Sequence, residues 1–200
     1  MVSKISSQKL SLLLLDYVAE LPASIKQFVS KEADLIFNKP PHDLAQDELI
    51  EKLMSLQEAG YISVQSVDGV CWNLRRKQST TFDVLELFVL LTPKGGSLWE
   101  KVYKPDWQKF ILVEVDSSSG KKEKCVLRSL NERRLKGILE KIKKLGEVGC
   151  LSSITSWNAT YWKMFEEGYQ LEFEALIDEA DTVLVEERMK WCLTWREITS

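Results

Sequence analysis

Residues 43–107 constrain the fold of this chain more than any other stretch, because their apolar pattern changes from helical to extended and back. The segment 43–59 repeats leucine and isoleucine at the spacing of one helical face, and Gly60 is the kind of residue that ends a helix in a left-handed conformation. Asp43, followed three residues later by Gln46, predicts a capped start for this helix. The stretch therefore begins with an amphipathic helix.

The segment that follows predicts a β-hairpin with a long tip and then a third strand. Asp68 and Gly69 provide the positive φ that a tight hairpin turn requires. Thr92 before Pro93 predicts the start of a second helix, because threonine caps a helix and proline fits its first position. The expected strands lie at 61–64, 70–74 and 84–91.

This order of helix, hairpin, third strand and helix is that of a winged helix. The segments LQEAGYI (residues 56–62) and LTPKGGSLWE (residues 91–100) resemble winged-helix regulators of the multiple-antibiotic-resistance family. In that family the first motif ends the recognition helix and the second begins the helix after the wing, so the resemblance implies the fold more than the activity. Residues 96–107 are also similar to bacterial proteins, a resemblance that implies a bacterial protein but no particular function.

We predict an α+β chain of two domains, a winged-helix domain at 1–107 and a small ββαββ domain at 108–200. In the first domain, further helices are expected at 8–21 and 23–37, where apolar residues recur at helical spacing. The expected strands of the second domain lie at 110–115, 124–127, 150–155 and 169–177.

The helix and the last segment of the second domain differ in how clearly they are patterned. Residues 131–145 carry the cleanest apolar stripe of the chain, and Ser129–Glu132 is expected to form the capping box before it. Residues 182–195 partly satisfy both the helical and the strand period. We favour a strand there, paired with 169–177.

Composition and motifs argue against several functional classes. The 200 residues are 44% hydrophobic and 28% charged, which is ordinary for a globular protein, and the net charge of −3 lacks the positive excess of a nucleic-acid binder. The four cysteines are widely spaced and His42 is the single histidine, so no zinc-binding pattern is present and reduced thiols are expected. With no nucleophile motif or phosphate-binding glycine loop, we expect neither an enzyme nor a cofactor.

The apolar run at the start of the chain, Ser11–Leu15, is too short for a signal peptide or a membrane span. We therefore expect a cytoplasmic protein that does not bind membranes.

Charge decides between DNA and protein as the partner of a winged helix. The would-be recognition helix carries five acids between residues 43 and 58 against one base, Lys52, although affinity for DNA comes largely from cations that neutralise phosphates. The wing tip offers cations that are able to grip phosphates instead. These tip residues are Arg75, Arg76 and Lys77.

The second domain segregates its charges along the chain. Residues 121–144 contain ten Lys or Arg against three Glu, a net of +7, whereas residues 165–200 contain ten acids against three bases, a net of −7. Either the two segments neutralise each other, or each is a solvated face, or the helix offers a basic surface to an acidic partner, which is a protein or a nucleic acid. The candidate partner-binding residues of that helix are Arg133, Arg134, Lys136 and Lys141.

Tryptophans concentrate in the last quarter of the chain, where each is either a core residue or an interface anchor. Trp191 and Trp195 are the candidates for partner binding. Taken together, the sequence favours a non-enzymatic cytosolic interaction module that uses a winged-helix scaffold to bind a protein, an accessory protein that blocks a charged partner being one form of it. The alternative is a winged-helix DNA-binding regulator.

Overall fold

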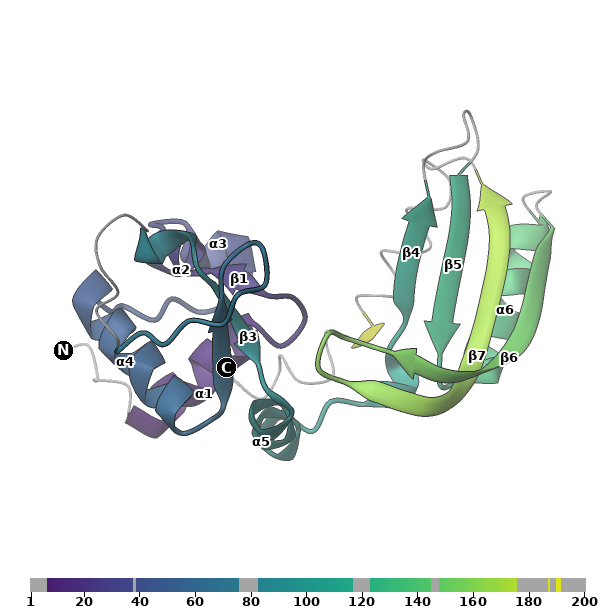
Figure 1. Cartoon of the computed structure of the whole chain (residues 1–200). Coiled ribbons are helices and arrows are strands. Elements are labelled where there is room, and N and C mark those ends of the chain that lie inside the picture. The colour runs from purple at the N-terminus through teal and green to yellow at the C-terminus, as the bar shows by residue number, and fades with distance from the viewer. Residues whose placement is uncertain are drawn as a thin grey trace. The chain divides into compact units, whose positions relative to one another are not determined.

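The computed structural model of the chain describes residues 7–37, 39–75, 83–116, 123–144, 148–175, 187, 190 and 191. Helices and antiparallel sheets are both present, so the chain is α+β (Figure 1). Its internal contacts divide it into two compact units, Met1–Val102 and Tyr103–Ser200. No helix in the described ranges combines the length and the apolar character that crossing a bilayer requires.

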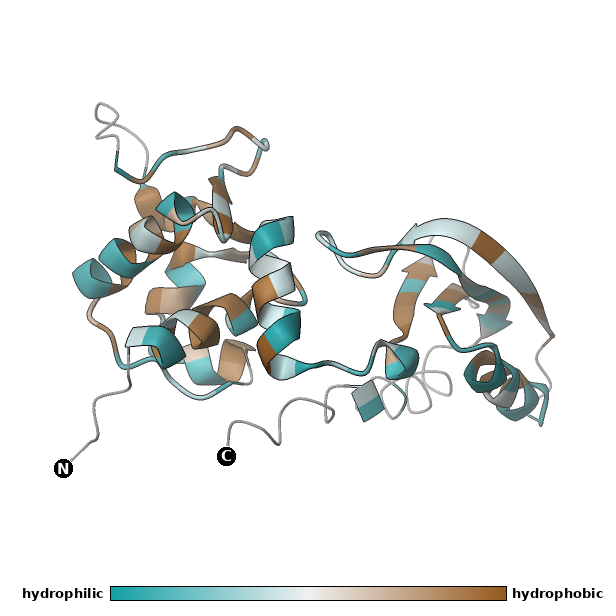
Figure 2. Cartoon of the chain, turned by 90° about the horizontal axis from the view of Figure 1, so that it is seen from below, coloured by the Kyte–Doolittle hydropathy of each residue, from teal (hydrophilic) through white to brown (hydrophobic). Residues whose placement is uncertain are grey.

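The first unit packs short helices against a three-stranded antiparallel sheet of order β1-β3-β2. Its helices carry hydrophilic residues on one side and hydrophobic residues on the other (Figure 2), as burial of a single face requires. The elements in chain order are α1 (Ser7–Tyr17), β1 (Ala23–Ser24), α2 (Ile25–Val29), α3 (Ala33–Phe37), α4 (Gln46–Glu58), β2 (Ile62–Gln65), the 3-10 helix η1 (Val84–Glu86), β3 (Phe88–Leu91) and α5 (Pro93–Tyr103).

The prediction of one helix over residues 23–37 is wrong. Ala23 and Ser24 extend to pair with β3, and the chain then forms two short helices, α2 and α3. Ser24 begins α2 through a capping box, because its hydroxyl accepts from Gln27 N at 3.4 Å and its own N–H donates to Gln27 Oε1 at 2.8 Å. The capping residue therefore lies inside the segment predicted as a continuous helix.

The predicted start of α4 at Asp43 is also wrong. Asp43 lies in the left-handed region with φ 54°, and the helix begins at Gln46 after Ala45. The Ala45 N–H donates to Glu48 Oε2 at 3.1 Å. A side chain at the start of α4 therefore satisfies a backbone donor, but it is that of Glu48 and not that of Asp43.

The hairpin after α4 is shorter than predicted. The turn at Ser66–Gly69 forms as expected, with Gly69 at φ 81°. On the returning side, however, only Cys71 makes a β-bridge, to Gln65, so the predicted strand at 70–74 is wrong. The predicted strand at 84–91 is confirmed over β3, but its first residues form η1.

The start of α5 confirms the predicted threonine cap. Thr92 Oγ1 accepts from Gly95 N at 3.1 Å and donates to Gly60 O at 2.6 Å, so the cap also holds the end of α4. Gly95 is required there because a Cβ at this position would lie 1.9 Å from Tyr61 O.

Replacing Gly95 by alanine should therefore lower the free energy of unfolding by about 1–3 kcal/mol, because backbone atoms must move to admit the methyl group. Gly137 is the matched control, since a Cβ there meets nothing within 4 Å and the residue lies inside a helix. Gly137→Ala should raise stability by about 0.5–1 kcal/mol in the same urea titration. Equal effects of the two substitutions would contradict the steric argument.

The second unit has the predicted order ββαββ and a four-stranded antiparallel sheet of order β4-β5-β7-β6. Helix α6 covers one face of this sheet, and the buried residues between them include Leu127, Leu135, Ile138 and Leu171. The elements are the 3-10 helix η2 (Trp107–Lys109), β4 (Leu112–Asp116), β5 (Glu123–Ser129), α6 (Glu132–Lys144), β6 (Gly149–Asn158) and β7 (Met164–Ala175).

Two predictions for this unit are wrong. The strand predicted at 182–195 is wrong at its described residues, Glu187, Lys190 and Trp191, which are helical, and its other residues lie outside the described part of the chain. Strands β5 and β6 already pair with the two sides of β7. Asn131, rather than Ser129, caps α6 by accepting from Arg134 N at 3.1 Å. The predicted last helical residue, at position 145, lies outside the described residues.

Candidate interaction surfaces

The outward face of α4 is acidic. Leu49, Leu53 and Leu56 face the core of the first unit. The single cation of the helix, Lys52, is half-buried and donates from Nζ to Ser7 O at 3.0 Å and to Ser7 Oγ at 2.9 Å. The exposed side chains of α4 include Asp47, Glu48, Glu51 and Glu58.

The chain that returns from the turn is held against the end of α4. Gln57 Nε2 donates to Trp72 O at 2.6 Å, and Gln57 Oε1 accepts from Leu74 N at 3.0 Å. Arg75 follows at once and forms an ion pair with Glu58, its Nη2 donating to Glu58 Oε2 at 2.9 Å. The predicted wing-tip cation Arg75 is therefore neutralised locally, and Arg76 and Lys77 lie outside the described residues.

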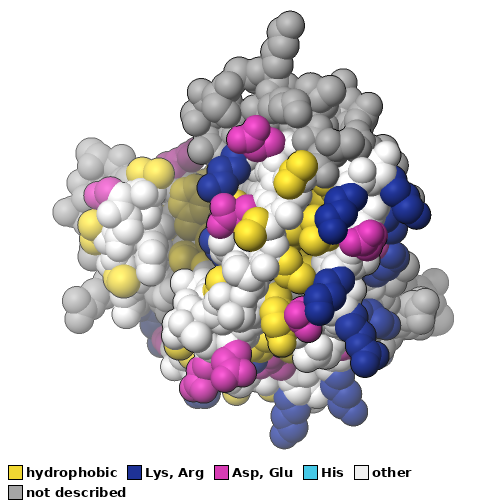
Figure 3. Space-filling view, turned by 90° about the vertical axis from the view of Figure 1, so that its right-hand side faces the viewer, with side chains coloured by type: hydrophobic (Ala, Val, Ile, Leu, Met, Phe, Trp, Pro, Cys, Tyr) yellow, Lys and Arg dark blue, Asp and Glu magenta, His cyan; other side chains and the backbone are white. Residues whose placement is uncertain are grey.

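The predicted basic residues of α6 separate into two groups. Arg133 and Lys136 are exposed, and Lys136 pairs with Glu132 of the same helix at 2.8 Å. Arg134 and Lys141 instead pair with Glu187, at 2.8 Å and 3.5 Å. Figure 3 shows Lys and Arg side chains beside a strip of hydrophobic side chains on the side of the molecule where α6 and β6 lie.

Glu187 is the centre of the second group. It is 4% exposed and also pairs with Lys190. Burial acts to raise the pKa of Glu187, but hydrogen bonds from Lys190 and Arg134 outweigh it and hold that pKa below its ordinary value. Part of the basic segment is thus neutralised by the acidic segment that follows it in the sequence.

Trp191 belongs to an aromatic cluster rather than to the surface. It is 2% exposed, and its ring centroid lies 4.7 Å from that of Phe110 and 5.4 Å from that of Trp107. Lys163 Nζ lies over the Trp107 ring at 5.5 Å from its centroid. Trp191 therefore packs in the core, and Trp195 lies outside the described residues.

A polar network covers the open face of the second sheet, which α6 does not cover. Arg128 joins β4 to β7, donating to Glu114 Oε1 at 2.8 Å and to Gln170 Oε1 at 2.7 Å. Glu172 pairs with Lys124 at 3.0 Å, and hydrogen bonds from Lys124 and then Gln170 lower the pKa of Glu172. The cations on this face are thus held beside carboxylates in cross-strand positions, which the sequence alone did not reveal.

His42 is a structural residue of the first unit. Nδ1 accepts from Leu44 N at 3.0 Å, so Nε2 carries the proton and donates to Phe28 O at 2.8 Å. Beside it, burial and then Asp34 and two further aspartates raise the pKa of Tyr17, whose hydroxyl donates to Pro40 O at 2.6 Å. Both imidazole nitrogens are used in packing the loop before α4.

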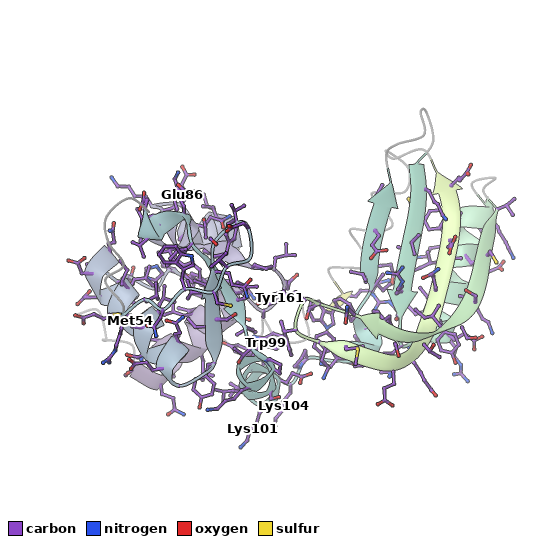
Figure 4. All side chains as sticks on the ribbon, in the orientation of Figure 1. Met54, Glu86, Trp99, Lys101, Lys104 and Tyr161 are labelled. Atoms are coloured by element: carbon purple, nitrogen blue, oxygen red, sulfur yellow. The ribbon has the colours of Figure 1, made fainter. Side chains whose placement is uncertain are left out.

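The first unit also contains a buried ion pair that the sequence did not indicate. Asp16 on α1 is 4% exposed, and its Oδ2 lies 2.8 Å from Lys39 Nζ. Its Oδ1 accepts from Trp99 Nε1 at 2.7 Å. Trp99, labelled in Figure 4, is fully buried on α5, so this group ties α1, α5 and the loop after α3 together.

In the described part of the chain no group of three or more histidine, cysteine or acidic side chains is placed to hold a metal ion, and the described cysteines, Cys71, Cys125 and Cys150, form no disulfide bond. Comparisons with protein-family models, with curated proteins and with solved structures find no match to this chain.

Proposed function

We propose that the first unit is a winged helix that serves as a protein-binding module of a non-enzymatic, cytosolic, bacterial protein. The order of its elements supports the fold: α1, β1, α2, α4, β2 and β3 follow one another, with α3 as an extra turn between α2 and α4. The sheet order β1-β3-β2 supports it too. It places β1, the strand before α2, at one edge and pairs it with β3, which with β2 forms the two strands of the proposed wing.

The observation that carries the choice of partner is the charge on α4. In a winged helix that binds DNA, this helix lies in the major groove beside phosphates. Here its exposed charged side chains are all acids, and Arg75, a described cation beside the end of the helix, is paired with Glu58. A surface of this sign repels DNA and suits the basic surface of a protein.

The first test measures DNA binding directly, by fluorescence anisotropy with a labelled duplex at low ionic strength. We expect no binding by the wild-type protein. If the wild type binds with an affinity that falls steeply with salt, and the triple variant Arg75→Ala/Arg76→Ala/Lys77→Ala weakens it, the DNA-binding regulator is the correct function instead.

The second test asks whether the acids of α4 hold a protein. A tagged wild-type chain should retain a partner from its native cytosol at near-physiological salt, and Asp47→Lys/Glu51→Lys should lose it, because both side chains are exposed on α4. Glu166→Lys/Glu174→Lys makes the same change of charge at exposed positions of β7 and should retain it. A pull-down that is empty, or that the two double variants affect equally, contradicts the proposal.

A further inference from the structure

Strand β6 is an edge strand with an unusual composition. It is outermost in the order β4-β5-β7-β6, and at ten residues it is much longer than the other described edge strands, β1, β2 and β4. Its sequence, GCLSSITSWN, contains neither a charged residue nor a proline. Charged residues and prolines are among the devices with which native proteins protect long edges, because an open row of backbone N–H and C=O groups recruits another strand.

The other edge of the same sheet shows the usual protection. Strand β4 carries Glu114 and Asp116 in five residues. On β6 the exposed residues are small and uncharged, among them Ser152, Ser153 and Thr155. Figure 3 faces the side of the molecule where β6 lies, and no described strand covers that edge. A ten-residue edge without charges is therefore built to be paired rather than to stay in solvent.

We propose that β6 pairs antiparallel with β6 of a second copy of this chain, which joins two four-stranded sheets into one. In such a pair a twofold axis relates the two copies of β6, so a residue beside the axis faces the same residue, or a close neighbour of it, in the second copy. A charged residue there would therefore meet a like charge. Strand β6 carries no charge, so this repulsion does not arise. A strand of another protein could carry the opposite charge, so pairing with it would not require an uncharged β6. The proposal concerns the second unit and does not depend on the function proposed for α4.

The register follows from the regular part of the strand. Pairing with β7 runs from Gly149 to Thr155 and is interrupted at Ser156, which has φ 53°. The centre of the regular segment is Ser152, so the axis passes beside Ser152 and places Leu151 opposite Ser153 of the second copy. Val148, 85% exposed just before β6, then adds apolar surface to the contact at both ends.

Sedimentation velocity over a range of protein concentrations tests the proposal on the full chain. The wild type should sediment with twice the mass of one chain, and Ser152→Lys should sediment as a monomer, because two lysines would face each other at the axis. Val115→Lys adds the same charge at a 46% exposed position of the opposite edge strand and should leave the dimer intact. Far-UV circular dichroism verifies that each variant is folded, and Ser153→Lys replaces Ser152→Lys if that variant does not fold.

Three outcomes overturn the proposal. The wild type is a monomer at every concentration, or the lysine on β6 leaves the dimer unchanged, or Val115→Lys dissociates it as fully as the lysine on β6. The result of the DNA-binding test and of the pull-down with the α4 variant has no bearing on these masses, so failure here and failure of the proposed function are separate results.

Discussion

Replacing Asp16 by asparagine should lower the free energy of unfolding by about 3–5 kcal/mol, the cost of breaking a buried ion pair by removing one partner. The side chain of Lys39, whose Nζ lies 2.8 Å from Asp16 Oδ2, is 6% exposed, so water does little to solvate its charge once the carboxylate is gone. Asparagine retains an oxygen that accepts from Trp99 Nε1. The loss therefore reports the charge of Asp16 rather than the tryptophan hydrogen bond.

A double variant separates the charge from the packing. Asp16→Asn/Lys39→Met removes both charges and keeps similar volumes, so it should recover most of the stability lost by Asp16→Asn alone. Lys26→Ala breaks an ion pair of similar length with Glu86, 3.0 Å, whose side chains are 67% and 55% exposed, and should cause no measurable change. Urea titrations followed by circular dichroism measure all three. If Asp16→Asn is as mild as Lys26→Ala, solvent reaches the Asp16 pair and the argument is wrong.

Elements whose signals are local could be predicted from the sequence. The stripe of α6, the Thr92-Pro93 start of α5 and the turn at Ser66–Gly69 each depend on residues within a few positions of one another. Predictions failed where a distant partner competes with local preference. Ala23–Ser24 is extended because β3 pairs with it, and 182–195 has no free strand edge on β7.

For the candidate surfaces, too, local features could be predicted from the sequence and contacts between distant residues could not. The acidity of α4 is a local property, and its exposure followed from the apolar stripe on the opposite face. The partner of Arg75 is 17 residues away, and that of Arg134 is 53 residues away, so charge counting could not say that either is neutralised. The polar network across Glu114, Arg128 and Gln170 depends on strand register, which no single stretch of sequence specifies.

The largest effect expected in the second unit is that of Glu187→Gln, which should cost about 3 kcal/mol of unfolding free energy at neutral pH. This value is the lower end of the range for a buried pair, because Lys141 and Lys190 are 47% and 53% exposed although Glu187 and Arg134 are only 5% and 12% exposed. Trp191 lies one helical turn further along and packs on Trp107, so the variant should also shift tryptophan fluorescence toward longer wavelength.

The cost of Glu187→Gln should depend on pH in a definite direction. Because the pKa of Glu187 is lower in the folded chain than its ordinary value of 4.5, the unfolded chain takes up the proton first as pH falls. The stabilisation is therefore complete at pH values above that ordinary pKa, which is the pKa of Glu187 in the unfolded chain, and is lost as pH falls through the folded pKa. The difference in stability between wild type and variant should be constant from pH 7 to about 5 and shrink at lower pH.

Glu140→Gln provides the control for both measurements. Glu140 pairs with Lys143 at 3.2 Å, but its side chain is 66% exposed, so this variant should change neither stability nor fluorescence measurably. A stability difference for Glu187→Gln that grows as pH falls would mean that burial, rather than the three cations, dominates the pKa of Glu187. Trp191 would then be held in place by its contacts with Trp107 and Phe110 rather than by the ion pairs, and Arg134 and Lys141 would be available to an acidic partner after all.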